Sequence, residues 1–166
     1  MQKHDFPLKK KVGKFTMEIE NKVNDLISEL TINDVDFTME GIADFLGVFL
    51  MINSKMSCYM EHKNQSIICI QKNDPDRMWE DFTHELGHYI LHDTNQTETN
   101  ELLNYKQEKE ADKFALLFQM PQQLIEDYEL FSERDLSAFF NIHLNQARKR
   151  LEMLYNYYFA TSPVGV

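Results

Sequence analysis

The segment 84–88, with the sequence HELGH, constrains the fold of this chain more than any other stretch. The tripeptide DPD at 74–76 precedes it as a strong helix start, because Asp caps free amide groups and Pro fits the first helical position. The pattern predicts a helix over about 75–92. Within this helix His84 and His88 are four residues apart, so they lie one above the other on the same face.

Two imidazoles on one helix face can point at a single metal ion. Glu85 is displaced from that face by about 100°, so its carboxylate can flank the ion and reach a bound water molecule. Zinc suits such a site, because catalytic zinc takes three nitrogen or oxygen ligands and keeps one position for water. The alternative interpretation is an exposed amphipathic helix that carries His and Glu by chance. A third ligand is needed to decide between the two.

His92 continues the series of histidines spaced four residues apart, but it is a poor third ligand. At 1.5 Å per residue, His84 and His92 lie about 12 Å apart along the helix axis, too far to share one ion. The metzincin spacing also fails, because it needs Gly at position 91 and His at position 94, where this chain has Leu91 and Thr94. We interpret His92 as a helix-end histidine favoured by the helix dipole.

The next predicted helix carries three acidic residues within five positions: Glu108, Glu110 and Asp112. Glu108 and Asp112 share one face, whereas Glu110 points about 200° away from Glu108 and is expected to be solvated. Glu108 would complete a site of two histidines and one glutamate, and Asp112 would orient one of the histidines from behind. The alternative is an ordinary charged surface helix. An apolar set on the same helix indicates instead that it is docked: Phe114, Leu117 and Phe118.

The rest of the chain predicts an α+β fold. Apolar spacing predicts a helix over about 14–30, and Thr38 and Gly47 would cap a second helix at its two ends. Three short runs rich in β-forming residues follow at 48–52, 58–62 and 66–71. The break between the last two has hairpin length, so we expect a small antiparallel sheet. Beyond a polar loop at 93–100, helices are predicted from about 106 to 120 and over 122–128, 133–140 and 145–159.

Composition excludes some classes of protein. The chain has 27 acidic and 17 basic residues and a net charge of −10, which argues against a broad nucleic-acid-binding face. No apolar run approaches the roughly 20 residues that cross a bilayer. The basic N-terminal stretch lacks the apolar segment of a secretory signal, so we expect a cytoplasmic protein. In a reducing compartment, Cys58 and Cys69 are expected to be buried thiols and not a disulfide.

Two segments together resemble the ImmA/IrrE family of metallopeptidases: DFTHELGHYILH at 81–92 and EKEADKFALLFQMP at 108–121. The family pattern is a HELGH-type helix followed by E-x-x-A-x-x-F-A and a hydrophobic run that ends in Met-Pro. The resemblance implies one Zn²⁺ per chain with the ligands His84, His88 and Glu108. It also implies that Glu85 is the general base.

The resemblance further implies a fold and a class of substrate. It implies a zincin-like domain over 1–130, with the N-terminal helices included and the small antiparallel sheet packed on the HExxH helix and the Glu-bearing helix. The segment 131–166 would be a helical, helix-turn-helix-like extension packed on it. The family is similar to cytoplasmic proteases that cleave phage or mobile-element repressors or related regulators, so the expected partner is a protein substrate of that kind. An edge of the sheet over 48–71 would bind it as an added strand.

Two other functions compete with the peptidase. The segment 132–159 has the outline of a helix-turn-helix, with Arg148, Lys149 and Arg150 on the second helix, which suggests a DNA-binding regulator. Apolar residues on that helix favour packing or partner docking instead: Leu151, Leu154, Tyr157 and Tyr158. A non-catalytic module stabilised by zinc is the third possibility. Glu85 argues against it, because a structural zinc site has no use for a base.

Overall fold

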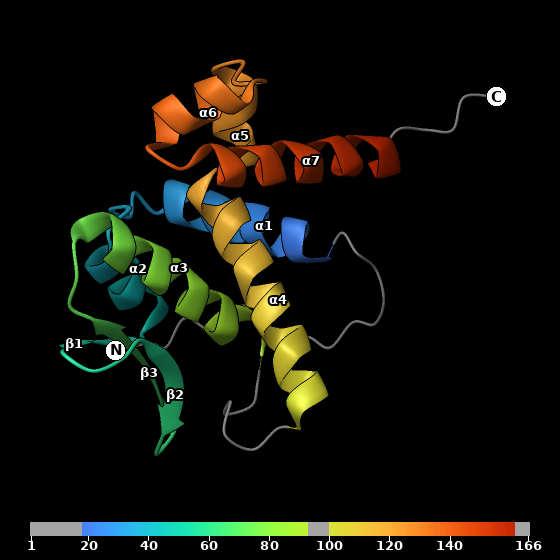
Figure 1. Cartoon of the computed structure of the whole chain (residues 1–166). Coiled ribbons are helices and arrows are strands. Elements are labelled where there is room, and N and C mark those ends of the chain that lie inside the picture. Colours follow the sequence, from blue (N-terminus) through green and yellow to red (C-terminus); the bar gives the residue numbers. More distant parts are fainter. Residues whose placement is uncertain (1–17, 93–99, 162–166) are drawn as a thin grey trace. The chain divides into compact units, whose positions relative to one another are not determined.

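The computed structural model describes residues 18–92 and 100–161, and it confirms the α+β class (Figure 1). The described chain forms two compact units, Met1–Ala115 and Leu116–Val166, and each is described by itself. The predicted division at residue 130 stays a prediction. In the structure Leu116, Met120 and Ile125 share a core with Leu136, Ala147 and Leu154 of the C-terminal helices.

The first two helices lie close to their predicted positions. Helix α1 spans Glu18–Ile32 and buries an apolar stripe that includes Val23, Leu26 and Leu30. The predicted residues 14–17 lie outside the described part. Helix α2 spans Met39–Leu46, and its two caps are confirmed: the Thr38 hydroxyl accepts a hydrogen bond from the Gly41 amide at 3.0 Å, and Gly47 is left-handed with φ 69°.

The sheet contains β1 (Phe49–Asn53), β2 (Cys58–His62) and β3 (Gln65–Gln71), in the order β1-β3-β2. Strands β2 and β3 form the predicted antiparallel hairpin, closed by Lys63 and Asn64 at positive φ. The prediction of a wholly antiparallel sheet is wrong for β1, which pairs with β3 in parallel. Strand β3 has three consecutive buried residues, Ile68, Cys69 and Ile70, and takes the covered central position of the sheet. Strand β1 therefore pairs with β3 and not with β2, the next strand along the chain.

Helix α3 spans Pro75–Leu91 and begins as predicted. The Asp74 carboxylate accepts a hydrogen bond from the Arg77 amide at 3.1 Å, and Pro75 opens the first turn. Phe82 and Leu86 on this helix are fully buried, like Ile68 and Ile70 of the central strand. Cys58 and Cys69 lie opposite each other on β2 and β3 as free thiols.

Helix α4 spans Glu101–Gln119 and begins five residues before the predicted start near Lys106. The Asn100 side chain accepts a hydrogen bond from the Leu103 amide at 2.9 Å and so caps the helix. Leu102 in the first turn is 84% exposed, so hydrophobic spacing gives no sign of this part of the helix. The end of the helix before Pro121 is confirmed.

The C-terminal unit contains α5 (Gln122–Asp127), α6 (Glu133–Phe140) and α7 (Leu144–Thr161), close to the predicted ranges. The Ser132 hydroxyl accepts from the Asp135 amide and caps α6. The core of this unit consists of Leu116, Met120, Ile125, Leu136, Ala147 and Leu154. Among the described residues, none of the helices combines the length and apolar character that a bilayer crossing requires.

Candidate metal centre

Helices α3 and α4 approach each other closely at Gly87. A Cβ atom at this glycine would lie 3.1 Å from the Ala111 Cα atom, 3.2 Å from the Ala111 carbonyl oxygen and 3.1 Å from the Phe114 Cβ atom. Two of these three neighbours belong to the backbone of α4, which cannot rotate aside as a side chain can. The absence of a side chain at Gly87 therefore sets the spacing of the two helices.

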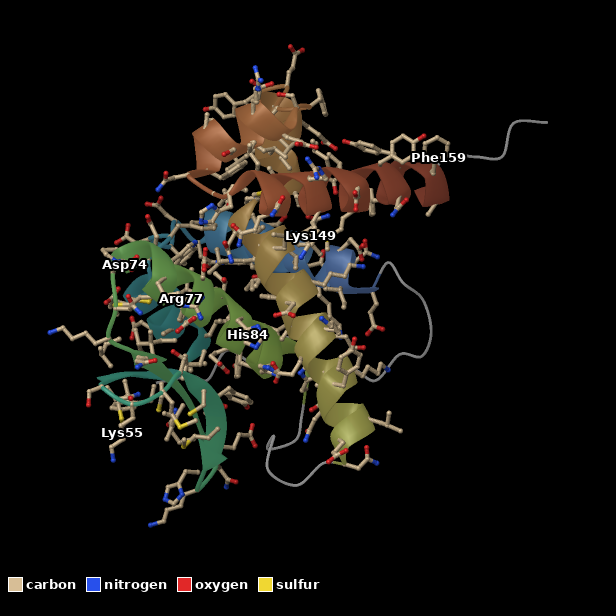
Figure 2. The ribbon with its side chains drawn as sticks, viewed as in Figure 1. Lys55, Asp74, Arg77, His84, Lys149 and Phe159 are labelled. Atoms are coloured by element: carbon tan, nitrogen blue, oxygen red, sulfur yellow. The ribbon has the colours of Figure 1, made fainter. Side chains whose placement is uncertain are left out.

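This crossing brings three predicted residues to one point. The Nε2 atom of His84 lies 3.1 Å from Glu108 Oε2, and the Nε2 atom of His88 lies 3.1 Å from Glu108 Oε1. The two Nε2 atoms are 3.2 Å apart. One donor atom from each residue lies within 4.8 Å of the other two. Figure 2 shows His84 on α3, on the side next to α4.

The three donors fit a metal ion of zinc's size and preference. Ligands at about 2.0–2.1 Å in tetrahedral geometry have donor atoms about 3.3 Å apart. The two Nε2 atoms are 3.2 Å apart, and each lies 3.1 Å from a different oxygen of Glu108. His88 is 1% exposed, and burial lowers its pKa to about 3, so the ring is neutral and keeps a lone pair for coordination. The side chains of His84 and Glu108 are 23% and 49% exposed, which leaves the cluster accessible from one side.

Asp112 lies behind His84. Its Oδ1 atom is 3.0 Å from the Nδ1 atom of His84. A carboxylate at this position accepts a hydrogen bond from the Nδ1–H group of His84. The Nε2 lone pair of His84 is then directed at Glu108 and His88. The contact suits the orienting role that the sequence suggests for Asp112.

Glu85 is buried on the sheet side of α3, with 6% exposure. A hydrogen bond from the backbone of Tyr59 on β2 reaches its carboxylate, while its Oε2 atom has no hydrogen-bond partner among the described residues. Burial raises the pKa of Glu85 to about 7, an effect that the nearby Glu108 strengthens and His84 opposes. A carboxyl group with a pKa near neutrality can both take up and return a proton.

His92 and Glu110 are the residues that sequence reasoning missed. His92 ends α3 as predicted, but it is only 7% exposed and burial lowers its pKa, so it is not a solvated cation favoured by the dipole. Glu110 was predicted to be solvated; its side chain is 31% exposed, and its Oε2 atom also lies 3.0 Å from His92 Nε2. The last turn of α3 occupies the side of α4 on which Glu110 lies. One sequence feature could have indicated that His92 contacts the site: His84, His88 and His92 follow one another at four-residue intervals.

Comparisons with known proteins agree with this geometry. Residues 46–152 match the sequence profile of the family described as Peptidase_M78, IrrE N-terminal-like domain. The chain is also similar to the phage-like element PBSX protein XkdA of Bacillus subtilis (strain 168), with 29% identity over 149 residues, 86% of this chain and 75% of that protein. The family match covers both segments that resemble the ImmA/IrrE pattern.

The substitution Gly87→Ala tests the helix crossing. Helix propensity alone predicts that it stabilises the protein by about 1 kcal/mol. The close backbone of α4 predicts the opposite sign, a loss of about 1–3 kcal/mol from overpacking. Urea denaturation of the two proteins measures the difference, and a more stable variant would contradict the assigned crossing.

Proposed function

The chain belongs to the Peptidase_M78 family of IrrE N-terminal-like domains, and from this we propose that it is a zinc-dependent endopeptidase acting on a specific cytoplasmic protein. The observation that carries the proposal is the convergence of His84, His88 and Glu108 beside the buried carboxylate of Glu85. Three ligands with one accessible side are the arrangement of a catalytic zinc site, since a structural site closes its fourth position.

Each residue of the site has one role in this proposal. His84, His88 and Glu108 hold the ion, and Asp112 orients His84 through its Nδ1–H group. A bound zinc ion supplies Lewis acidity, which polarises the scissile carbonyl and lowers the pKa of a coordinated water.

Glu85 moves the proton. Its carboxylate accepts a proton from the attacking water and passes it to the leaving amine. Burial supports this role, because it raises the pKa of Glu85 to about 7 and so brings it close to the pH at which the proton must be taken and returned. The hydrogen bond from the Tyr59 backbone holds the carboxylate in place without satisfying its Oε2 atom.

The same hydrogen bond supports a substrate path along β2. Strand β2 is an edge strand of the sheet, and the backbone of Tyr59 on this strand hydrogen-bonds the Glu85 carboxylate. This strand therefore lies beside the proposed base. A peptide that adds to this edge as a further strand would run past the catalytic carboxylate.

The proposed substrate is a repressor of a phage or mobile element, or a similar helix-turn-helix regulator. Two arguments support this class. The ImmA/IrrE resemblance implies it, and the similar protein XkdA is by its name a protein of the phage-like element PBSX.

The DNA-binding alternative receives little support from α7. Arg148 forms a two-point ion pair with Glu133, with distances of 2.8 and 3.2 Å, and both belong to the C-terminal unit. Arg150 is 2% exposed, and its Nε atom donates to the Met120 carbonyl oxygen at 2.9 Å. Two of the three basic side chains on the suggested recognition helix thus serve the fold itself.

The substitution Glu85→Gln separates metal binding from chemistry. The amide cannot accept the water proton, so we expect normal zinc content and a loss of cleavage of at least about 100-fold. The assay is the appearance of a shortened repressor during co-expression, together with the zinc content of the purified protein. A fully active Gln variant would refute the role of Glu85 as base.

Removal of the third ligand tests the metal site. Glu108→Ala should lose most of the bound zinc, because two histidines alone leave the ion half coordinated. Glu101→Ala, at the exposed start of the same helix, is the matched control and should retain it. Zinc content unchanged by Glu108→Ala would point to a different third ligand.

A photo-crosslinking amino acid at Met60 tests the path along β2. Met60 is 39% exposed on this strand, and we expect it to capture the repressor in the Glu85→Gln background, where substrate is bound but not cleaved. The same label at Ile32, 81% exposed at the end of α1, is the control. Equal capture at both positions would count against the assigned path.

A further inference from the structure

A line of polar side chains leads from His88 away from the metal cluster. The Nδ1 atom of His88 lies 3.1 Å from the Nδ1 atom of His92, and the Nε2 atom of His92 lies 3.0 Å from Glu110 Oε2. Both histidines are buried, with 1% and 7% exposure, and their ring centroids are 5.1 Å apart. None of the roles proposed above uses His92 or Glu110.

The carboxylate at the end of this line fixes the direction of both hydrogen bonds. An ionised Glu110 can only accept, so His92 must carry its proton on Nε2. A neutral imidazole has one N–H group, and therefore His92 Nδ1 is an acceptor. His88 must then donate from its own Nδ1, which leaves its Nε2 lone pair directed at Glu108 and His84.

The opposite direction of these hydrogen bonds is excluded for two reasons. A proton on His92 Nδ1 would place the bare Nε2 lone pair against the Glu110 carboxylate, so that two acceptors would face each other at 3.0 Å. It would also move the His88 proton to Nε2, where it would block coordination.

We propose that His92 and Glu110 are positioning residues that set the tautomer and ring orientation of His88, as Asp112 does for His84. His84 contacts its carboxylate directly, whereas His88 reaches one through a second imidazole. This inference rests on the proposed metal site. Partners behind a metal ligand typically contribute about 10–100-fold to metal affinity.

Two substitutions at His92 distinguish positioning from space filling. Phe retains a ring of similar size but neither accepts nor donates, and we expect zinc affinity to fall about 10–100-fold. Gln leaves more of the space empty, yet it can accept from His88 and donate to Glu110, so it should recover part of the loss. A role in packing alone predicts the reverse order, with Phe close to the unsubstituted protein. That order, measured by competition for Zn²⁺ with a chelator, would overturn the proposal.

A second pair of variants acts at the partly exposed end of the line, where unfolding is not a concern. Glu110→Ala removes the final acceptor and should weaken zinc binding about tenfold. Glu110 is also 3.5 Å from Lys106 one turn earlier on α4, so Lys106→Ala is the control for that ion pair. Equal affinities for Glu110→Ala and the unsubstituted protein would contradict the proposal, as would an equal loss in the two variants.

Long-range proton–nitrogen NMR of the zinc-loaded protein tests the proton positions directly. We expect His88 in the Nδ1–H form and His92 in the Nε2–H form, and the His92 pattern should disappear in His92→Phe. His92 found in the Nδ1–H form would overturn the assignment while leaving the peptidase proposal intact. An unsubstituted protein that binds no zinc would overturn both.

Discussion

The close crossing of α3 and α4 at Gly87 and Ala111 is the constraint on which the rest of the site depends. Gly87 directly precedes His88, and Ala111 lies about one turn after Glu108, so this close contact adjoins the donor atoms. Larger side chains here would separate a ligand set that spans two helices. Packing thus decides whether three donors share one point, and a metal ion would complete an arrangement that the apolar contacts prepare.

Burial gives the site its electrostatic character. Taking polar groups out of water is costly unless they find partners, and the buried groups of this site differ in how far they do so. His88 is neutral because it is buried, and His92 and Glu110 lie behind it. Glu85 retains one oxygen atom without a partner among the described residues, and its pKa is raised to about 7. A carboxyl group that is incompletely satisfied in this way is suited to proton transfer.

Local sequence signals predicted the elements that carry the site. The helix start at Asp74 and Pro75 and the four-residue spacing of His84 and His88 are properties of a single helix, and both could be taken from the sequence. Glu108 followed from the face it shares with Asp112 on the next helix. Such features depend on a few neighbouring residues, so no knowledge of the tertiary fold is needed to place them.

What the sequence did not predict depends on neighbours far along the chain. The parallel pairing of β1 with β3 depends on which strand takes the centre of the sheet. The β-forming residues of a strand do not indicate its place in the sheet. Glu110 lies away from Glu108 on α4 and is partly exposed as predicted, but the contact with His92 at the end of α3 depends on how the two helices pack. The hydrogen bond from Tyr59 to Glu85 comes from the backbone, which leaves no trace in the side-chain pattern.

The most direct measurement of the central claim is X-ray absorption at the zinc edge of the metal-loaded protein. We predict one ion per chain with nitrogen and oxygen ligands at about 2.0–2.2 Å, including the scattering of two imidazoles. Sulfur at about 2.3 Å would place the ion at Cys58 or Cys69 instead. That result, or a single imidazole, would contradict a site built jointly by α3 and α4.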